Sequence, residues 1–371
     1  MKRLQSLSDT AKEADRQLKI CNACRYCEGY CAVWPAMERR TDFKRGDVAY
    51  LANLCYNCRE CYYACPFVPP HEFAINIPQI LSQARLETYE AQSTPKGTSS
   101  FFRRPWLFSA VVGILGIALL FIFASLMGNP SRIFSTQLGA GSFYVIIPYL
   151  VIIGAGLGVG AYVLYTYALE LRSFLASIDL KLGDFFKPEA FFLASADALK
   201  HTFFRGGGAG CNYPGEKGQY SYMSLHMMVF YGFLSAIVST ILAGIYQDYL
   251  HIMPPYAIAT PPVLFGIAGG VLMVAATSVL LYYKVISDKA PSLKKMLSLD
   301  TAFLLTLDVT SITGFLVLFL RSTSAMGSMF LLHLGLVLAL FVTAPYGKFA
   351  HAFYRFASLV KNRVEELHAI K

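Results

Sequence analysis

Residues 106–127 read WLFSAVVGILGIALLFIFASLM, an apolar run long enough to cross a lipid bilayer. A transmembrane helix needs about 20 consecutive apolar residues. This run divides the 371-residue chain, because the part before it is charged and rich in cysteine, whereas the part after it consists of apolar runs separated by short polar breaks. We therefore expect an N-terminal domain over residues 1–97 and a membrane domain over residues 98–371.

The composition of the whole chain supports this division. Hydrophobic residues make up 55% of the sequence and charged residues 15%, and the mean hydropathy is +0.47. Soluble proteins carry about 25% charged residues, so the deficit indicates a bilayer rather than a large soluble core. The first long apolar run begins too late to be a signal peptide. The N-terminal domain is therefore expected to stay on the side of the membrane where it is made.

Five further runs have the length and composition of membrane-spanning helices. They cover residues 143–167, 223–246, 263–286, 299–320 and 326–343. Together with residues 106–127 they predict a mainly α fold, in which an α-helical ferredoxin-like domain is followed by a six-helix transmembrane bundle.

The basic residues predict how this bundle is oriented. Of the 32 Lys and Arg, the expected outer loops 128–142, 248–261 and 321–325 hold only Arg132 and Arg321. Basic residues favour the cytoplasmic side of a membrane. We therefore expect a multi-pass protein of the bacterial inner (cytoplasmic) membrane with both termini cytoplasmic. The net charge of +9 then faces anionic lipid headgroups, and no nucleic-acid partner is needed to explain it.

Eight of the nine cysteines form two arrays of identical spacing. The first is Cys21-x2-Cys24-x2-Cys27-x3-Cys31, and the second is Cys55-x2-Cys58-x2-Cys61-x3-Cys65-Pro66. This spacing is typical of [4Fe–4S] ligation, in which the fourth cysteine of each array binds the other cluster. We assign one cluster to Cys21, Cys24, Cys27 and Cys65, and the other to Cys55, Cys58, Cys61 and Cys31.

Two other uses of the cysteines fit less well. Disulfides are disfavoured in the reducing cytoplasm, and a structural zinc site needs a single set of four ligands, usually as two separated pairs. Residues 46–54 between the arrays indicate a helix, and residues 1–90 show little β-type alternation. The domain therefore resembles the α-helical ferredoxin modules of respiratory reductases. Cys211 has no cysteine near it in the sequence and receives no role.

Four histidines lie in or beside the expected spans and are candidate axial ligands of a b haem, which needs inward-facing imidazoles in a helical bundle. His226 and His351 both fall at the inner side and are the preferred pair. His333 and His251 are the candidates for a second, outer haem. Pro345 lies between His333 and His351, which leaves open whether they share one helix face. The remaining histidines are expected in soluble or interfacial positions.

Three other features bear on function. Asp308 lies inside an expected span, where an ionisable residue is a functional hypothesis by default; it would deliver protons to a quinone, or be a hydrogen-bonded buried acid. Residues 189–204 predict an interfacial amphipathic helix. The glycine-rich residues 205–214 predict a tight loop that serves as a docking surface or a wall of a quinone pocket.

The chain resembles the tricarballylate utilization protein B family, also called citrate utilization protein B. The resemblance rests on GDVAYLANLCYNCRECYYACP (46–66), FFRGGGAGCNYP (203–214), LHMMVFYGFL (225–234) and LLHLGLVLALFVTAPYGKFAHAFYRFASLV (331–360). It implies that the protein reoxidises a partner flavoprotein, an FAD-dependent tricarballylate dehydrogenase. Electrons would pass by way of the two [4Fe–4S] clusters and a b haem to membrane quinone.

Two further functions are compatible with the sequence. One is a quinol-linked reductase that feeds a soluble acceptor, and the other is a membrane redox sensor or anchor without turnover. No dinucleotide-binding fingerprint and no nucleophile–base motif is visible, so electrons must come from another protein.

Overall fold

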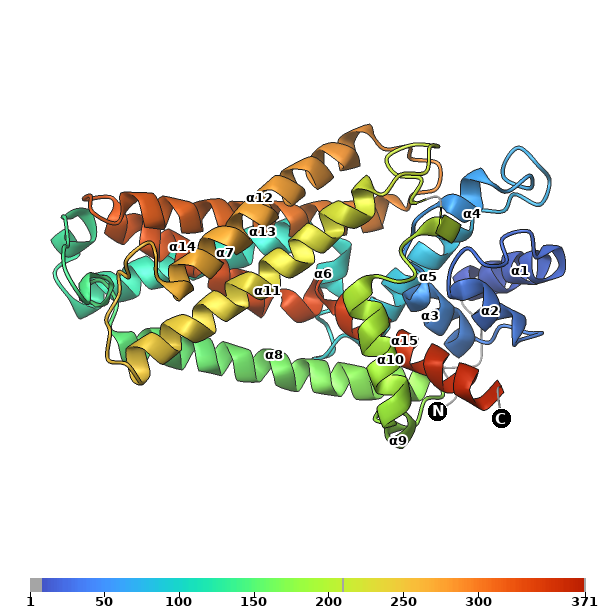
Figure 1. The fold of residues 1–371 in the computed structure, drawn as a ribbon, viewed down its shortest axis with the longest axis horizontal. Helices are drawn as coiled ribbons and strands as arrows, with labels where there is room; N and C mark the ends of the chain where they lie inside the picture. The colour runs from blue at the N-terminus through green and yellow to red at the C-terminus, as the bar shows by residue number, and fades with distance from the viewer. Residues whose placement is uncertain (1–8, 209, 370–371) are drawn as a thin grey trace.

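The computed structural model describes residues 9–208 and 210–369, which form an elongated molecule built from helices (Figure 1). Long helices occupy one end, and a group of shorter helices from the N-terminal part occupies the other. Helix α1, which begins at Asp9, and α15, which ends at Ala369, both lie at the end with the short helices. Within the described residues the only β pairing is an isolated bridge between Cys211 and Gln219.

The N-terminal domain is built from five helices around a common core. The core side chains include Leu18, Trp34, Met37, Leu51 and Leu81, all of which are buried. Helix α5 begins where the side chain of Asn76 accepts a hydrogen bond from the backbone N–H of Gln79, which satisfies one of the free donors at a helix start. The helices are α1 (Asp9–Cys24), α2 (Val33–Glu38), α3 (Arg45–Leu54), α4 (Glu60–Tyr63) and α5 (Ile77–Gln92).

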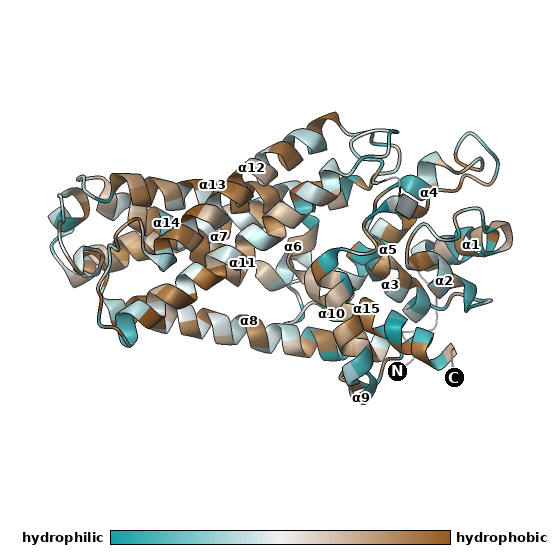
Figure 2. Ribbon diagram, viewed as in Figure 1, coloured by the Kyte–Doolittle hydropathy of each residue, from teal (hydrophilic) through white to brown (hydrophobic). Residues whose placement is uncertain are grey.

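Among the residues that the structure describes, the membrane domain contains five helices that are long and apolar enough to cross a bilayer. They are α7 (Pro105–Met127), α8 (Tyr149–Ser177), α11 (Ser221–Asp248), α12 (Pro261–Ile286) and α13 (Lys294–Leu320). The sixth predicted span corresponds to α14 (Met326–Val342), which is apolar but has only 17 residues, the lower limit for crossing the hydrocarbon core. Figure 2 shows the hydrophobic colouring concentrated along these helices. The predicted fold class is confirmed, with five full-length spans and one short apolar helix.

Two predicted elements differ in extent from the observed helices. The run 143–167 begins with a 3-10 turn (η3, Ser142–Val145), and α8 starts only at Tyr149, because Pro148 disfavours helical backbone in the residue before it. The predicted helix 189–204 is α10 (Pro188–Lys200), which ends where His201 adopts a left-handed conformation.

The C-terminal segment also departs from a continuous helix. Helix α14 ends at Val342, a short 3-10 turn (η5, Ala344–Tyr346) contains Pro345, and α15 (Ala350–Ala369) then begins. Proline lacks the N–H that would continue a helix. His333 and His351 are therefore on different helices and do not share a face.

Helix α15 joins the two halves of the molecule. It leaves the membrane domain and packs against α3, α8 and α10. Glu365 pairs with Arg40 of the N-terminal domain, and Arg363 pairs with Asp197 of α10 at 2.6 Å. The remaining short helices are α6 (Ser100–Arg103), η2 (Pro130–Phe134), α9 (Leu182–Phe185) and η4 (Gly206–Gly208).

Glycines allow α11 and α12 to approach closely. A Cβ atom on Gly269 would lie 2.6 Å from the carbonyl oxygen of Gly232, and one on Gly232 would lie 2.9 Å from that of Gly269. Small residues at such contacts let membrane helices pack by van der Waals interaction.

We expect Gly269→Leu to destabilise the membrane domain by about 1–3 kcal/mol, because the added side chain would push α11 away from α12. Thermal unfolding in detergent, followed by fluorescence, would measure this. Gly154→Leu on α8 is the matched control, since a Cβ atom there meets nothing within 4 Å. Equal melting temperatures for the two variants would contradict the close contact.

Candidate cofactor site

The first cysteine set surrounds a small hollow at the end of α1. Cys21, Cys24, Cys27 and Cys65 line it, together with Tyr26, Trp34 and Phe67. Burial and then the neighbouring thiols Cys65, Cys27 and Cys24 raise the pKa of the Cys21 thiol. The structure therefore brings together the four cysteines that the crossed spacing predicts for one cluster. Cys61 also borders this hollow.

The second cysteine set surrounds an adjacent hollow. Cys31, Cys55, Cys58 and Cys61 line it. Asn57 and Arg59 both have positive φ angles, 58° and 69°, and these reversals turn the closely spaced cysteines of this array towards one side. The backbone N–H of Asn57 donates a hydrogen bond to the Cys55 sulfur at 3.3 Å, an interaction that stabilises a thiolate.

The properties of both sets fit iron–sulfur clusters. Burial and neighbouring thiols raise the pKa of Cys27 to about 12, and burial is the main cause that raises the pKa of Cys58 to about 12. Such crowded thiols ionise only when a cation compensates their charge. Within residues 9–208 and 210–369, no three Cys, His, Asp or Glu side chains converge on a single-ion site. A cubane suits the wider arrangement, because each thiolate binds a different iron.

The two hollows differ in their exposure. Cys24 is exposed and Tyr26 beside it is 62% exposed, whereas Cys55 and Cys58 are buried. The first set therefore faces outward, and the second set faces the interior of the molecule.

The glycine-rich loop, described over residues 205–208 and 210–214, contacts two residues that line the second hollow, Tyr30 and Cys58. The N–H of Gly207 donates to the carbonyl of Tyr30 at 2.8 Å, and that of Asn212 donates to the carbonyl of Cys58 at 2.9 Å. A Cβ atom on Gly207, whose φ is +66°, would lie 3.0 Å from the Tyr30 ring. The loop thus lies against the cysteine array. Cys211, within the loop, is buried, and its thiol is directed to the carbonyl of Phe204 at 3.6 Å.

His226 and His351 lie next to each other at the end of the bundle that faces the cysteine domain. Their ring centroids are 6.3 Å apart and their planes are inclined at 81°. Two metal–imidazole bonds of about 2 Å each, together with the radii of the two rings, account for this separation. The geometry therefore fits an iron ion between the two rings.

Hydrogen bonds leave the Nε2 atoms of both rings available. His201 Nδ1 donates to the carbonyl of Leu199 at 3.3 Å, so its Nε2 accepts from His226 Nδ1 at 3.0 Å. His351 Nδ1 donates to the carbonyl of Lys348. Among the described residues, neither His226 Nε2 nor His351 Nε2 has a hydrogen-bond partner. Metal-binding histidines typically donate their second nitrogen in this way.

The protonation state of His351 also suits metal binding. Burial, followed by the nearby cations Arg355 and Lys348, holds the pKa of His351 well below its ordinary value. The ring is therefore neutral at physiological pH, the form that binds metals.

His201 is the residue that the sequence analysis missed. It is only 4% exposed and supports His226, although its position suggested a soluble or interfacial role. Burial lowers the pKa of His201, consistent with a neutral acceptor. The ring of His201 turns inward because the backbone at this residue, directly after α10, is left-handed. No sequence pattern marks this conformation, so the sequence holds no signal for the position of His201.

The outer histidines are not brought together. His333 on α14 lies 3.2 Å from both Thr313 Oγ1 and the carbonyl of Thr310 on α13. His251 is exposed in the loop after α11. Asp308 is buried and accepts a hydrogen bond from Thr277 on α12 at 2.7 Å.

Aromatic rings connect the second hollow to the histidine pair. Tyr56, between Cys55 and Cys58, lies 5.2 Å from Phe204, whose ring lies 5.4 Å from that of His226. On the other side, Arg355 follows His351 by one helical turn and donates to the carbonyl of Cys55 at 3.0 Å. Its guanidinium also lies over the Tyr56 ring at 4.3 Å. The second cysteine set and the histidine pair are thus in contact through two short routes.

Comparison with known proteins agrees with this arrangement. The family model described as Citrate utilization protein B Fer4-like domain matches residues 14–91, and that described as Citrate utilization protein B matches residues 103–370. Citrate utilization protein B of Escherichia coli is 36% identical over 374 residues, covering 99% of this chain and 97% of that protein. No solved structure matches the chain. The chain therefore belongs to the citrate utilization protein B family, and it is a multi-pass, membrane-embedded iron–sulfur protein of electron transfer.

Proposed function

We propose that this protein reoxidises a partner FAD-dependent dehydrogenase and passes the electrons, by way of two [4Fe–4S] clusters and a b haem, to the membrane quinone pool. The observation that carries the proposal is the contact of Tyr56 with Phe204 and of Phe204 with His226. It connects the interior cysteine set to the histidine pair without a gap. When bound, the clusters and the haem supply one-electron carriers.

The residues of the chain have distinct tasks in this proposal. Cys21, Cys24, Cys27 and Cys65 hold the outward cluster, which the flavoprotein reaches on the side of the exposed Cys24. Cys31, Cys55, Cys58 and Cys61 hold the inward cluster. The glycine-rich loop shields that set from water, and His226 and His351 hold the haem. His201 orients His226 through its hydrogen bond.

The partner and the membrane are proposed on related grounds. The name of the Escherichia coli relative refers to citrate utilization, which favours a dehydrogenase of tricarboxylates such as tricarballylate as the electron donor. The distribution of basic residues, of which only Arg132 and Arg321 fall in the expected outer loops, supports a cytoplasmic cysteine domain on the bacterial inner membrane.

A direct experiment tests whether a quinone accepts the electrons. Anaerobically purified protein is reduced with substoichiometric dithionite and then mixed with menadione in a stopped-flow spectrophotometer. We expect rapid reoxidation of the iron–sulfur and haem absorption bands. Protein that stays reduced in the presence of menadione would contradict quinone as the acceptor.

We expect about eight iron and eight sulfide per chain beyond any haem, as two cubane clusters require. Cys24→Ser should remove the outward cluster and Cys58→Ser the inward one, each reducing the iron content by about half. Cys211→Ser is the control and should remove neither, because its thiol is directed to a carbonyl. Iron and sulfide analysis with EPR spectroscopy measures this, and stoichiometric zinc would contradict it.

We expect a low-spin b-type haem spectrum that is lost in His226→Ala and in His351→Ala, because each removes one axial ligand. His71→Ala and His368→Ala should retain it. His333→Ala should retain it as well, since that ring is hydrogen-bonded to α13. Optical spectra of protein made with ample haem measure the outcome; complete loss in His333→Ala would show that the pair has been assigned wrongly.

His201→Leu provides a finer measurement on the same haem. The variant should keep the haem but raise its midpoint potential, because His226 Nδ1 then loses the acceptor that makes the imidazole a stronger donor. A purely structural role for His201 would leave the potential unchanged.

We expect reporter fusions after Gly128, Asp248 and Ser322 to lie outside the cytoplasm, and fusions after Lys187 and Lys289 to lie inside, following the distribution of basic residues. Paired phosphatase and fluorescent-protein fusions measure this. An outside location at Lys289 would show that one of the four long helices before it, α7, α8, α11 or α12, does not span the membrane as proposed.

A further inference from the structure

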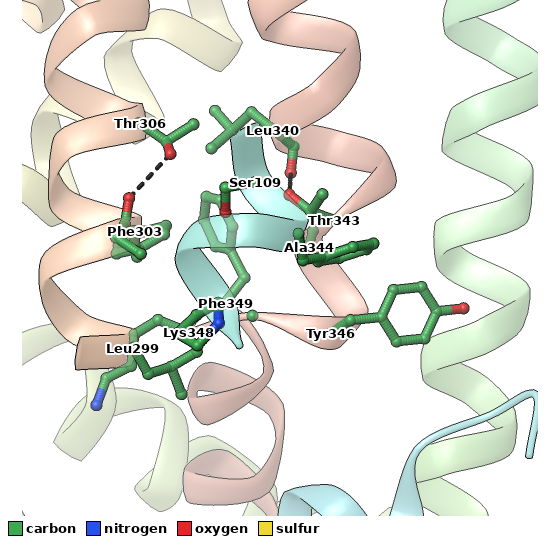
Figure 3. Close-up of a pocket in the computed structure, with 14 residues that line it drawn as sticks. Ser109, Leu299, Phe303, Thr306, Leu340, Thr343, Ala344, Tyr346, Lys348 and Phe349 are labelled. Carbon is green, nitrogen blue, oxygen red and sulfur yellow. Dashed lines mark hydrogen bonds between the residues drawn. The ribbon is translucent and has the colours of Figure 1, made fainter. Parts of the chain in front are cut away.

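Another hollow lies at the inner end of the bundle, separate from the two cysteine sets (Figure 3). It is enclosed by the start of α7, the first half of α13, the end of α14 and the segment after η5. Its walls are mostly apolar, and the side chains that matter here are Phe108, Ser109, Phe303, Thr306, Thr343 and Lys348. Largely apolar cavities with a few polar groups are typical of small-molecule sites. We name it the Lys348 hollow.

The Lys348 hollow contains hydrogen-bond donors on two different elements. The hydroxyls of Thr306 and Thr343 already donate to backbone carbonyls of their own helices. Ser109 Oγ has no hydrogen-bond partner among the described residues. The Lys348 ammonium has three donors, of which one is directed to Asp300 at 2.6 Å and one to the Met296 sulfur at 3.7 Å, so one stays available. The available donors therefore come from α7 and from the segment after η5.

Lys348 belongs to a buried charged group of three residues. Its Nζ lies 2.6 Å from one carboxylate oxygen of Asp300, and Lys284 Nζ lies 2.8 Å from the other. The three side chains are only 17%, 15% and 7% exposed for Lys348, Asp300 and Lys284. One carboxylate shared by two ammonium groups leaves one positive charge in excess. Such a charge is costly in a protein interior unless an electron-rich partner compensates it.

The Lys348 hollow is directly connected to the histidine pair. The carbonyl of Lys348 accepts the hydrogen bond from His351 Nδ1. The neighbouring Phe349 also lines the hollow, with its ring 4.8 Å from Phe303 and 5.1 Å from Phe233 on α11. A ligand in the hollow would therefore lie beside the segment that holds the proposed haem.

We propose that the Lys348 hollow binds the ring of a membrane quinone, with Lys348 Nζ donating a hydrogen bond to one carbonyl oxygen and Ser109 donating to the other. This inference rests on the proposed function. The quinone takes up two electrons, which the reduced flavoprotein supplies, and two protons from the inner aqueous side. Both C=O groups become C–OH, and the product is the quinol.

Asp308, which the sequence suggests as a residue that delivers protons to a quinone, lies outside the Lys348 hollow. Asp308 is paired with Thr277 where α12 and α13 meet, and it does not line the Lys348 hollow. Asp300, two turns nearer the inner end of the same helix, is the carboxylate beside the hollow. Substitutions at Lys348 and at Asp308 therefore distinguish the two locations.

Binding of a quinone analogue is the main test. A fluorescent hydroxyquinoline N-oxide is titrated into purified full-length protein, and the quenching of its fluorescence gives the dissociation constant. We expect Lys348→Met to weaken binding about tenfold or more, the effect of losing one hydrogen bond to a charged group. The variant should fold, because it leaves Lys284 and Asp300 as a neutral pair.

The matched control is Lys295→Met. It removes an exposed lysine at the start of α13, the helix that carries Asp300, and the variant should bind the analogue as the wild type does. Ser109→Phe is the second variant, since it fills the hollow from α7 and should also abolish binding. Iron–sulfur and haem spectra unchanged from the wild type would verify that each variant is assembled.

The outcomes separate this inference from the proposed function. Unchanged binding in both Lys348→Met and Ser109→Phe, or weakened binding only in Asp308→Asn, overturns the Lys348 hollow as the quinone site, even if menadione reoxidises the wild type. A phospholipid as the natural occupant would give that same result. Wild-type protein that menadione cannot reoxidise overturns the proposed function itself.

Discussion

The docking of helix α15 onto the cysteine domain is the contact on which the other features of the molecule depend. The ion pair of Arg40 with Glu365 and the hydrogen bond of Arg355 to the carbonyl of Cys55 fix this helix against the second cysteine array. The same helix carries His351 in its first turn, so a shift of α15 would move a proposed haem ligand and the adjacent proposed cluster site apart. Electron transfer needs these sites to remain close, and a single rigid helix provides that.

Two buried arginines lie where α15 meets the cysteine domain, and the negative charge of the proposed cluster site would compensate them. Arg85 donates to the carbonyls of Ala52 and Cys55, and Arg355 donates to the carbonyl of Cys55 and lies over Tyr56. In the described part of the chain, neither guanidinium pairs with a carboxylate. Burying a charge without compensation is costly. In the proposed cluster site, four thiolates beside the two arginines would supply the negative charge that compensates them.

The chemistry of the site was predictable where it depends on local spacing. The convergence of each cysteine set on one hollow was predictable, because x2 spacing brings three thiols to one side of a short turn. The proximity of His226 and His351 was predictable from depth alone, since both lie near the ends of apolar runs on the same side. The role of His201 was not predictable, because it depends on a single left-handed residue after α10. The glycine loop over Cys58 depends on a long-range backbone hydrogen bond, which sequence spacing does not reveal.

The extents of the helices were less predictable than their number. Proline accounts for the late start of α8 and for the break between α14 and α15. The break matters for function, because a continuous helix would have carried His351 away from His226. Instead, the turn at Pro345 lets α15 leave the bundle at an angle set by its packing on α3 and α10, and this places the His351 ring beside α11. The same turn forms one wall of the Lys348 hollow.

The location of all proposed redox groups at one end of the bundle has an energetic consequence. Moving one charge across the whole membrane against a potential of 100 mV costs about 2.3 kcal/mol. Electrons that pass from the cysteine domain to His226 and His351, and then to the adjacent Lys348 hollow, remain at the inner end, and the protons are taken up from the same side. Quinone reduction by this route would therefore move almost no net charge through the membrane potential. A route through an outer haem at His333 would not share this property, because the electron would travel towards the opposite face while its protons stayed behind.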